Sequence, residues 1–425
     1  MTRIEERLRD ALSAKAAQVQ DGRLRALPGP DPATERKARR RQAWRAWLIP
    51  VAAAASVLLI IGLVYAVTRH ATQGQPAVSQ PPRPSYFVRI VGTGPSNRIE
   101  VQSVSTGAVI ATVAPPKPLP GGVVDYEALA AAPDDRTFYV EYSAFSANLT
   151  VKQVWILSFS LTSSGAATPL TMVRGGLIKN QPGGLETWGN LAVSADGSRL
   201  ALTVNSGDLL PAPNAGYSDK IIVIDLRSGQ REVWDRAGLY YQPGKIFSIQ
   251  DLSWAADGRS LIFLAVWCGT GSCNGTPGPG GYRDARVYSL GPVGDGATSL
   301  NRASVLVPQS ARYPVIAQAL GGPRGSDLTL AVLSGHADQN GNWPELTVQE
   351  FSASGSPRGV DYRIKGLHAN AHQVWLTADP SGQHLLVSYA VPGGFTIGWI
   401  ANGAFHRLPI TQPYLPRDAT LVIAW

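Results

Sequence analysis

Residues 191–204 read LAVSADGSRLALTV, and residues 252–266 read LSWAADGRSLIFLAV. Each segment consists of an apolar strand, a turn that contains Asp-Gly, and a second apolar strand. Asp-Gly closes a tight hairpin because the Asp side chain accepts hydrogen bonds within the turn and Gly readily adopts a positive φ. A third copy, with Asp-Asp in the turn, begins at Leu129, and looser copies begin at Leu320 and Leu376. The five segments therefore predict five β-hairpins.

A second motif, an alternating strand that ends in a Gly-containing turn, alternates with the first along the chain. Its six copies end at Gly107, Gly165, Gly229, Gly296, Gly355 and Gly403. Two hairpins per unit give four antiparallel strands. Such units, repeated every ~50–65 residues, are typical of the blades of a β-propeller. A β-sandwich is the alternative fold, but it would not need the same pair of motifs six times.

The two ends of this region predict how the ring closes. Residues 86–113 contain three strands and lack the opening strand of a unit, whereas residues 420–425 form an opening strand with no partner after it. We therefore expect residues 420–425 to complete the first blade. The fold class predicted for residues 86–425 is all-β, a six-bladed β-propeller closed by the C-terminal strand, and closure would hide the sheet edges.

Basic residues are concentrated in the first 45 residues. This tail holds 12 Lys/Arg and 6 Asp/Glu, whereas the remaining 380 residues hold 26 and 24. The large part of the chain is close to neutral, which argues against nucleic acid as a partner. We expect residues 1–45 to begin with a short amphipathic helix, which would either stay solvated or bind a cytoplasmic partner.

An uncharged stretch, residues 46–68, follows the arginine-rich end of the tail. As a helix its apolar part would be about 31 Å long, close to the hydrocarbon thickness of a bilayer. Trp44, Trp47 and Tyr65 are placed as membrane-interface aromatics. The basic residues precede the span, so the positive-inside rule predicts a cytoplasmic N-terminus and an extracytoplasmic C-terminal domain at the cell membrane. A Pro-rich linker, residues 69–85, would join the two.

Residues 46–68 have two other interpretations. One is a buried core helix, but such a helix seldom runs this long without a charge. The other is a signal peptide cleaved near Val64-Tyr65-Ala66. Its apolar region would be longer than the 7–15 residues usual for a signal peptide.

The repeats resemble a known family of folds. LAVSADGSRL and LSWAADGRSL, each followed by a strand such as IIVIDLRSG, resemble the WD40-like or TolB-like propeller repeats of bacterial envelope proteins. This resemblance implies the fold and no particular function, because propellers host both binding modules and enzymes. The order of basic tail, single span and propeller also resembles membrane proteins of actinobacteria.

Few residues carry recognisable chemistry. Cys268 and Cys273 lie in a Gly-rich segment after the second strand of the fourth unit, and in an oxidising compartment we expect them to form a disulfide. A redox pair would lack the usual Cys-x-x-Cys spacing. His368 and His372 have the spacing of metal ligands on a helix, but they enter a predicted strand, so we expect no metal site.

The sequence shows no nucleophile elbow, no phosphate-binding loop and no marked pair of acid–base carboxylates. We therefore predict no catalytic residue and no cofactor. Asp134, Asp196 and Asp257 are interpreted as turn formers.

The function that the sequence favours is a membrane-anchored extracytoplasmic propeller. It would bind, sense or scaffold an unknown ligand or protein, with the lipid bilayer as a partner through residues 46–68. Two alternatives stay open. One is a propeller hydrolase acting on envelope glycans or lactones, which convergent carboxylates or histidines near the ring centre would favour. The other is a transmembrane regulator that signals through residues 1–45.

Overall fold

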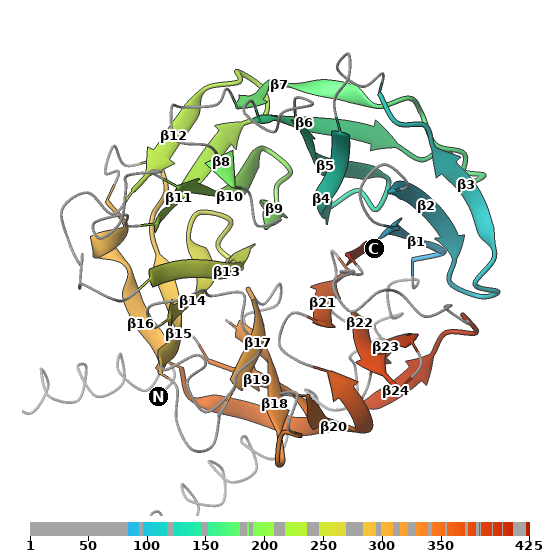
Figure 1. Cartoon of the computed structure of the whole chain (residues 1–425), viewed down its shortest axis with the longest axis vertical. Helices are drawn as coiled ribbons and strands as arrows, with labels where there is room; N and C mark the ends of the chain where they lie inside the picture. Colours follow the sequence, from blue (N-terminus) through green and yellow to red (C-terminus); the bar gives the residue numbers. More distant parts are fainter. Residues whose placement is uncertain are drawn as a thin grey trace, which may run out of the picture. The chain divides into compact units, whose positions relative to one another are not determined.

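The computed structural model of the chain contains a ring of six four-stranded blades (Figure 1). The chain divides into two units, Met1–Gln80 and Pro81–Trp425, and the ring belongs to the second. Blades 3 and 4 also touch edge to edge, through a parallel pairing of Ser218 with Phe247. The structure describes residues 84–92, 97–116, 123–145, 152–178, 185–186, 190–207, 217–235, 246–268, 284–294, 299–308, 315–321, 328–338, 342–352, 355–369, 373–379, 382, 384–392, 394–401, 403–410 and 422–425.

Each blade runs from an innermost to an outermost strand. In blade order, the innermost strands are β25 (Ile423–Ala424), β4 (Val123–Ala131), β9 (Leu191–Val193), β13 (Ile246–Trp254), β17 (Val315–Leu320) and β21 (Val374–Ala378). The second strands are β1 (Tyr86–Val91), β5 (Thr137–Phe145), β10 (Arg199–Gly207), β14 (Leu261–Cys268), β18 (Leu328–Ser334) and β22 (Leu385–Val391).

The outer half of each blade completes the sheet. The third strands are β2 (Arg98–Ser103), β6 (Lys152–Ser160), β11 (Tyr217–Asp225), β15 (Asp284–Leu290), β19 (Trp343–Phe351) and β23 (Gly394–Ala401). The outermost strands are β3 (Val109–Val113), β7 (Thr171–Ile178), β12 (Arg231–Trp234), β16 (Ser304–Pro308), β20 (Pro357–Ala369) and β24 (Ala404–Arg407). Blade 3 also has β8 (Leu185–Glu186) beside β10, and a short 3₁₀ helix, η2 (Leu300–Arg302), precedes β16.

The end of the chain closes the ring. β25 pairs antiparallel with β1, with Ala424 opposite Val88 and Ile423 opposite Arg89. Ile90 N donates a further hydrogen bond to the carbonyl of Val422 at 3.0 Å. The predicted six-bladed fold and its closure by the C-terminal strand are therefore confirmed.

The turns of the first motif form as their sequences predict. Asp196 Oδ1 accepts a hydrogen bond from Ser198 N at 3.0 Å, and Asp257 Oδ1 accepts from Ser260 N at 2.8 Å. Gly197 has a φ of 68° and Gly258 a φ of 62°, the left-handed conformation that favours glycine. Asp134 makes equivalent bonds in blade 2, where its neighbour has the unusual φ of 56° without being glycine. The interpretation of the three aspartates as turn formers is confirmed.

The core lies between the blades. Strand alternation gives each sheet two apolar faces, and each face packs against the blade beside it. Phe87 of β1 and Trp425, for example, belong to one buried cluster with residues of blades 5 and 6, whereas Val88 and Ala424 pack toward blade 2. Each blade therefore needs both of its neighbours to bury its apolar surface.

The N-terminal predictions lie outside the described residues. These are the helical tail at 1–45, the span at 46–68 with Trp44, Trp47 and Tyr65, and the linker at 69–85, of which only the last two residues are described. Within the part of the chain that the structure describes, no helix has the length and apolarity needed to span a bilayer.

Truncating Trp425 to Ala should destabilise the ring strongly. The Trp425 side chain is 1% exposed, and removing a buried aromatic ring typically costs about 3–5 kcal/mol. Thermal unfolding of the full chain measures this effect. Met172→Ala on the outermost strand β7 is the matched control, since Met172 is 60% exposed. Equal unfolding temperatures for the two variants would contradict closure by this segment.

Candidate functional site

Polar side chains near the ring centre connect neighbouring blades. At the junction of blades 3 and 4, Asp219 accepts a hydrogen bond from Ile249 N, and Asn190 Nδ2 donates to the Ile249 carbonyl at 3.2 Å. At the junction of blades 4 and 5, Asp251 Oδ2 accepts from Ala319 N at 2.7 Å. In each case a side chain of one blade bonds to the inner-strand backbone of the next.

Two further junctions use the same arrangement with neutral side chains. Gln318 of blade 5 accepts a hydrogen bond from Leu376 N of blade 6. Asn97, just before β2 in blade 1, donates to the Tyr126 carbonyl of β4 at 3.1 Å. Among the described residues, side chains thus satisfy inner-strand backbone groups at four of the blade junctions.

β-Bulges in three inner strands help to place these side chains. The pairing with the second strand shifts by one residue between Tyr126 and Ala128, between Ile249 and Asp251, and between Ile316 and Gln318. In β13 and β17, the residue directly after the shift supplies the bond to the next blade. A bulge re-aims a side chain, and here it turns a polar one toward a neighbouring blade.

The carboxyl groups of Asp219 and Asp251 each accept a backbone hydrogen bond across these junctions. Their side chains belong to residues that are 1% and 7% exposed. Burial raises the pKa of each to about 7, although the hydrogen bonds that they accept act in the opposite direction. A raised carboxyl pKa is common in catalytic acids. Here, however, the groups face the backbone of an adjacent blade, and burial leaves almost no surface for a substrate.

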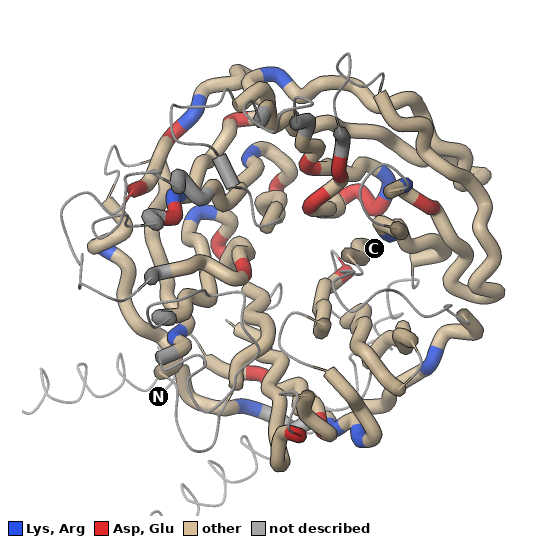
Figure 2. The backbone as a smooth tube through the Cα atoms, viewed as in Figure 1, with Lys and Arg blue, Asp and Glu red and all other residues tan. Residues whose placement is uncertain are grey.

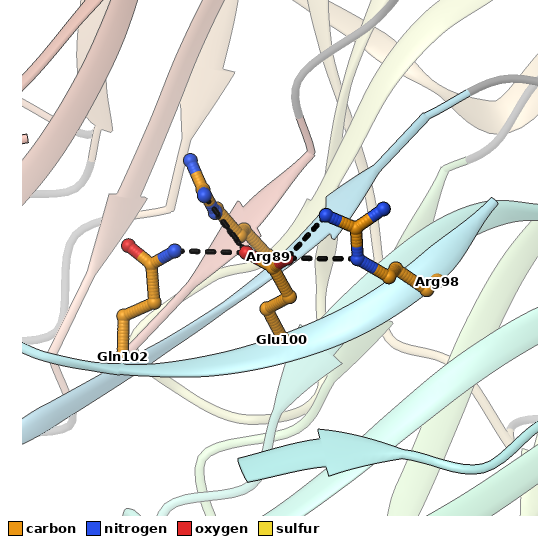
Figure 3. A network of polar contacts seen from close by, with 4 residues as sticks. All are labelled: Arg89, Arg98, Glu100 and Gln102. Atoms are coloured by element: carbon orange, nitrogen blue, oxygen red, sulfur yellow. Dashed lines mark hydrogen bonds and ion pairs between the residues drawn. The ribbon is translucent and has the colours of Figure 1, made fainter. Parts of the chain in front are cut away.

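The closing blade contains a buried ionic network (Figure 3). Glu100 Oε2 accepts from Arg89 Nη2 at 2.8 Å and from Gln102 Nε2 at 2.9 Å, and its Oε1 accepts from Arg98 Nε at 2.8 Å. The Arg89 and Glu100 side chains are 9% and 5% exposed, whereas Arg98 is 51% exposed. One carboxylate therefore serves two guanidinium groups beside the strand that closes the ring.

The network keeps its members charged. Burial alone would raise the pKa of Glu100, but the hydrogen bonds and charges of Arg89 and Arg98 outweigh it and hold that pKa below its ordinary value. Burial lowers the pKa of Arg89, against the effect of Glu100. Because both partners of a buried ion pair depend on each other, the network fixes β1 against β2 next to the closing strand.

A buried histidine–carboxylate pair lies in the β21–β22 hairpin of blade 6. His384 Nδ1 is 2.8 Å from Asp379 Oδ2, and the side chains are 6% and 3% exposed. The His384 ring packs edge-on against Trp399 and Trp425. Such a pair orients the base in many hydrolases. Here it also spans the two ends of a turn, since Asp379 N donates to the His384 carbonyl, so it braces the hairpin.

Asp135 is a carboxyl group with a raised pKa that is only partly buried. Burial, with the nearby charges of Asp379 and Asp134, raises the pKa of Asp135 to about 6. Its Oδ1 is buried without a hydrogen-bond partner. Asp135 stands where the hairpins of blades 3 and 4 have glycine, and its positive φ marks a strained position of the kind found at functional sites.

Charge is distributed unevenly from centre to rim (Figure 2). The six innermost strands have no Lys or Arg within their bounds, and their charged residues are Asp125, Glu127 and Asp251. The outermost strands carry six basic residues, Arg174, Arg231, Arg358, Arg363, Lys365 and Arg407, and two acidic ones, Glu232 and Asp361. The innermost strands thus carry no positive charge within their bounds, which is unfavourable for a polyanionic ligand there.

The predictions for the cysteine and histidine residues can be compared with the structure only in part. Cys268 is the last residue of β14, but its side chain and Cys273 lie outside the described residues, so the disulfide stays a prediction. His368 lies on β20, half exposed, with Nε2 3.0 Å from Asn342 Nδ2. His372 is outside the described residues. Within the described ranges, no group of three or more metal-binding side chains comes together.

Sequence reasoning missed the junction residues. Gln318 interrupts the otherwise apolar strand VIAQAL, whereas Asp219 and Asp251 lie in strands that mix polar and apolar residues, YSDKIIVID and IFSIQDLSW. A polar residue in a strand that must be buried on both faces is itself a signal that a bonding partner exists. The partner cannot be identified from the strand alone, because it lies on another blade.

Comparison with known proteins does not identify a family or an activity for this chain. No protein-family model and no curated protein matches the chain, so its likeness to WD40-like or TolB-like repeats and to actinobacterial membrane proteins rests on the sequence pattern alone. Among solved structures, the haemagglutinin-neuraminidase ectodomain of parainfluenza virus 5 is 9% identical with a TM-score of 0.39, covering 88% of this chain and 89% of that one.

Two other similar structures are enzymes. Hydrazine synthase of Kuenenia stuttgartiensis is 12% identical with a TM-score of 0.37, over 76% of this chain and 98% of that one. The acylaminoacyl peptidase of Pyrococcus horikoshii is 10% identical with a TM-score of 0.38, over 67% of this chain. The chain spans only 39% of that peptidase and 36% of a similar prolyl endopeptidase. At these identities and TM-scores, the matches carry no information on activity.

Replacing Glu100 with Gln should destabilise the ring by about 3–5 kcal/mol, because a buried guanidinium loses its counter-charge. The change is nearly isosteric, so packing is preserved. Chemical unfolding of the full chain measures it, with Glu350→Gln at an exposed position of β19 as the control. A loss no larger than that of the control would show that the network contributes nothing to closure.

Proposed function

We propose that the chain is a membrane-anchored extracytoplasmic β-propeller that acts as a binding, sensing or scaffolding module. The observation that carries this proposal is the use of polar groups near the ring centre. Asp219, Asp251, Gln318 and Asn97 bond to backbone groups of adjacent blades. Side chains committed in this way support a rigid binding scaffold better than they support acid–base chemistry.

The arrangement of the strands favours one face as the binding face. The first and second strands are joined by short turns, such as 132–136 and 194–198, at the face that we call the turn face. The second and third strands are joined at the opposite face, the loop face, by segments such as 208–216 and 269–283. Longer connections on a rigid scaffold are where binding residues gather. We therefore assign the ligand to the loop face.

The ligand class can be narrowed by charge. The acidic innermost strands disfavour nucleic acids and other polyanions at the ring centre. We propose an extracytoplasmic protein, or a neutral or cationic ligand, as the partner.

Membrane anchoring is proposed from the sequence. The uncharged residues 46–68, preceded by the basic tail, would span the bilayer with the N-terminus in the cytoplasm. Protease treatment of intact cells tests this orientation. We expect digestion of a C-terminal epitope and protection of an N-terminal one, and the opposite result would contradict the proposed orientation.

Site-specific photo-cross-linking in living cells tests the binding role. A cross-linking amino acid at His336, exposed on the loop face, should capture a partner reproducibly. The same amino acid at Ser163, exposed on the turn face in the β6–β7 connection, should not. Capture only from Ser163, or from neither position, would contradict binding at the loop face.

The hydrolase alternative has one observation in its favour, the raised pKa of Asp135 beside the Asp379–His384 pair. Asp135→Asn would remove the proton donor and leave the size of the side chain almost unchanged. Turnover of glycosides or lactones by the purified chain, lost in this variant, would support the enzyme in place of the binding module. The regulator alternative predicts that deleting residues 1–40 abolishes the cellular phenotype while membrane insertion persists.

A further inference from the structure

The innermost strand of blade 4, β13, is attached to both neighbouring blades through buried carboxyl groups. On the blade 3 side, Asp219 accepts the hydrogen bond of Ile249 N. On the blade 5 side, Asp251 itself reaches across to Ala319 N at 2.7 Å. No other innermost strand has a buried aspartate bond at each of its two junctions within the described residues. Blade 4 therefore has a buried carboxyl bond at each of its two junctions, beside neutral bonds such as those from Asn190 Nδ2 to the Ile249 carbonyl and from Ser253 Oγ to the Ala319 carbonyl.

Within the part of the chain that the structure describes, no cation contributes to the pKa of either group. The pKa of Asp219 is affected by burial and by bonds from Ile249 N and the Ser248 hydroxyl, and that of Asp251 by burial and by the Ala319 and Leu252 amides. Besides the two aspartates, the titratable or charged residues on β13 and on β8, β9, β10, β11, β14 and β17 around it are Glu186, Arg199, Tyr217, Lys220, Asp225 and Cys268.

The nearest of these charges do not neutralise the aspartates. Lys220 follows Asp219 on β11, and strand alternation points it to the opposite face of the sheet. Arg199 donates to the Val293 carbonyl at 3.0 Å and is close to Asp225. If both aspartates ionise, two buried negative charges stand on the two sides of one strand, and burial of an unpaired charge is costly.

Asp219 has a free position for a proton. Its Oδ2 accepts from Ile249 N, while its Oδ1 is buried without a hydrogen-bond partner. Thr203 of β10 lies on the same face of blade 3, since Asn205 is opposite Asp219 and Thr203 is two residues further along. The Thr203 hydroxyl is also buried and without a hydrogen-bond partner.

We propose that the junctions on either side of β13 form a proton-dependent attachment of blade 4. With the two carboxyl groups neutral, the blade is held on both sides without buried charge. When they ionise, blade 4 opens locally more often than the rest of the ring. This attachment does not depend on the proposed binding role.

The direction of the pH effect follows from linkage. The pKa of each aspartate is about 7 in the folded chain and about 4 in an unfolded one. The folded state binds more protons in that interval, so the free energy of unfolding falls as pH rises from about 4 to 7 and is flat above it. Asp196 behaves oppositely, because bonds from Ser194 and Ser198 lower its pKa to about 2, and its contribution is lost only in stronger acid.

Hydrogen–deuterium exchange of the full chain between pH 5.5 and 8.5, corrected for intrinsic exchange rates, tests the proposal. The opening equilibrium of the β13 amides should increase at least about tenfold over this range, since one pKa unit corresponds to tenfold. The opening equilibrium of the β1 and β2 amides in blade 1 should not show this increase with pH. In the double variant Asp219→Asn, Asp251→Asn, which keeps an oxygen acceptor at each position, this pH dependence should vanish.

The turn variant Asp196→Asn is the matched control and should keep the pH profile of the original chain. A β13 opening equilibrium that is independent of pH, or an unchanged profile in the double variant, overturns the proposal. Should the double variant not fold, infrared spectra of the original chain and of each single variant decide. A protonated-carboxyl band present at pH 5.5, absent at pH 8.5 and reduced in each single variant supports the proposal, and its absence at pH 5.5 overturns it.

Discussion

The pairing of β25 with β1 is the contact on which the rest of the ring depends. It is short, with Ala424 opposite Val88 and Ile423 opposite Arg89. Its importance follows from the way that the blades are buried, because each sheet covers the apolar face of the next. Without β25, Phe87 and its neighbours on blade 1 would lose the cover of Trp425, and the facing side of blade 6 would be opened to water. A closed ring leaves no end blade with one face uncovered.

Closure by apolar packing does not by itself fix how each blade is placed against the next. Two packed apolar faces can shift slightly against each other at little energetic cost, whereas a buried polar atom must keep its hydrogen-bond partner. The side-chain bonds between blades supply this constraint, and three of them join residues 58, 59 and 68 positions apart. These separations are close to one repeat of the sequence. Each of these hydrogen bonds thus joins equivalent inner-strand regions of two successive blades.

The repeats explain which parts of this structure could be predicted from sequence. The Asp-Gly turns and the alternating strands are local, so the four strands of each blade and their order follow from short motifs. The closing strand follows from counting, since the first unit is one strand short. The bulges in β4, β13 and β17 and the partners of Asp219, Asp251 and Gln318 could not be predicted, because they depend on contacts between blades. The strained turn at Asp135 could not be predicted either. The sequence Pro133-Asp134-Asp135 has Asp at the position where a turn with positive φ would be expected to have glycine.

Three of the buried carboxyl groups among the described residues, Glu100, Asp219 and Asp251, respond to pH in two opposite ways. Glu100 is charged because two guanidinium groups surround it, so its network at the closing junction persists from mildly acidic to alkaline conditions. Asp219 and Asp251 are bonded only to neutral donors, so their charge is uncompensated. A rise in pH therefore leaves closure intact and weakens the attachment of blade 4. Because the closing contact and the proton-sensitive contacts lie in different blades, the ring can loosen at one blade without coming apart.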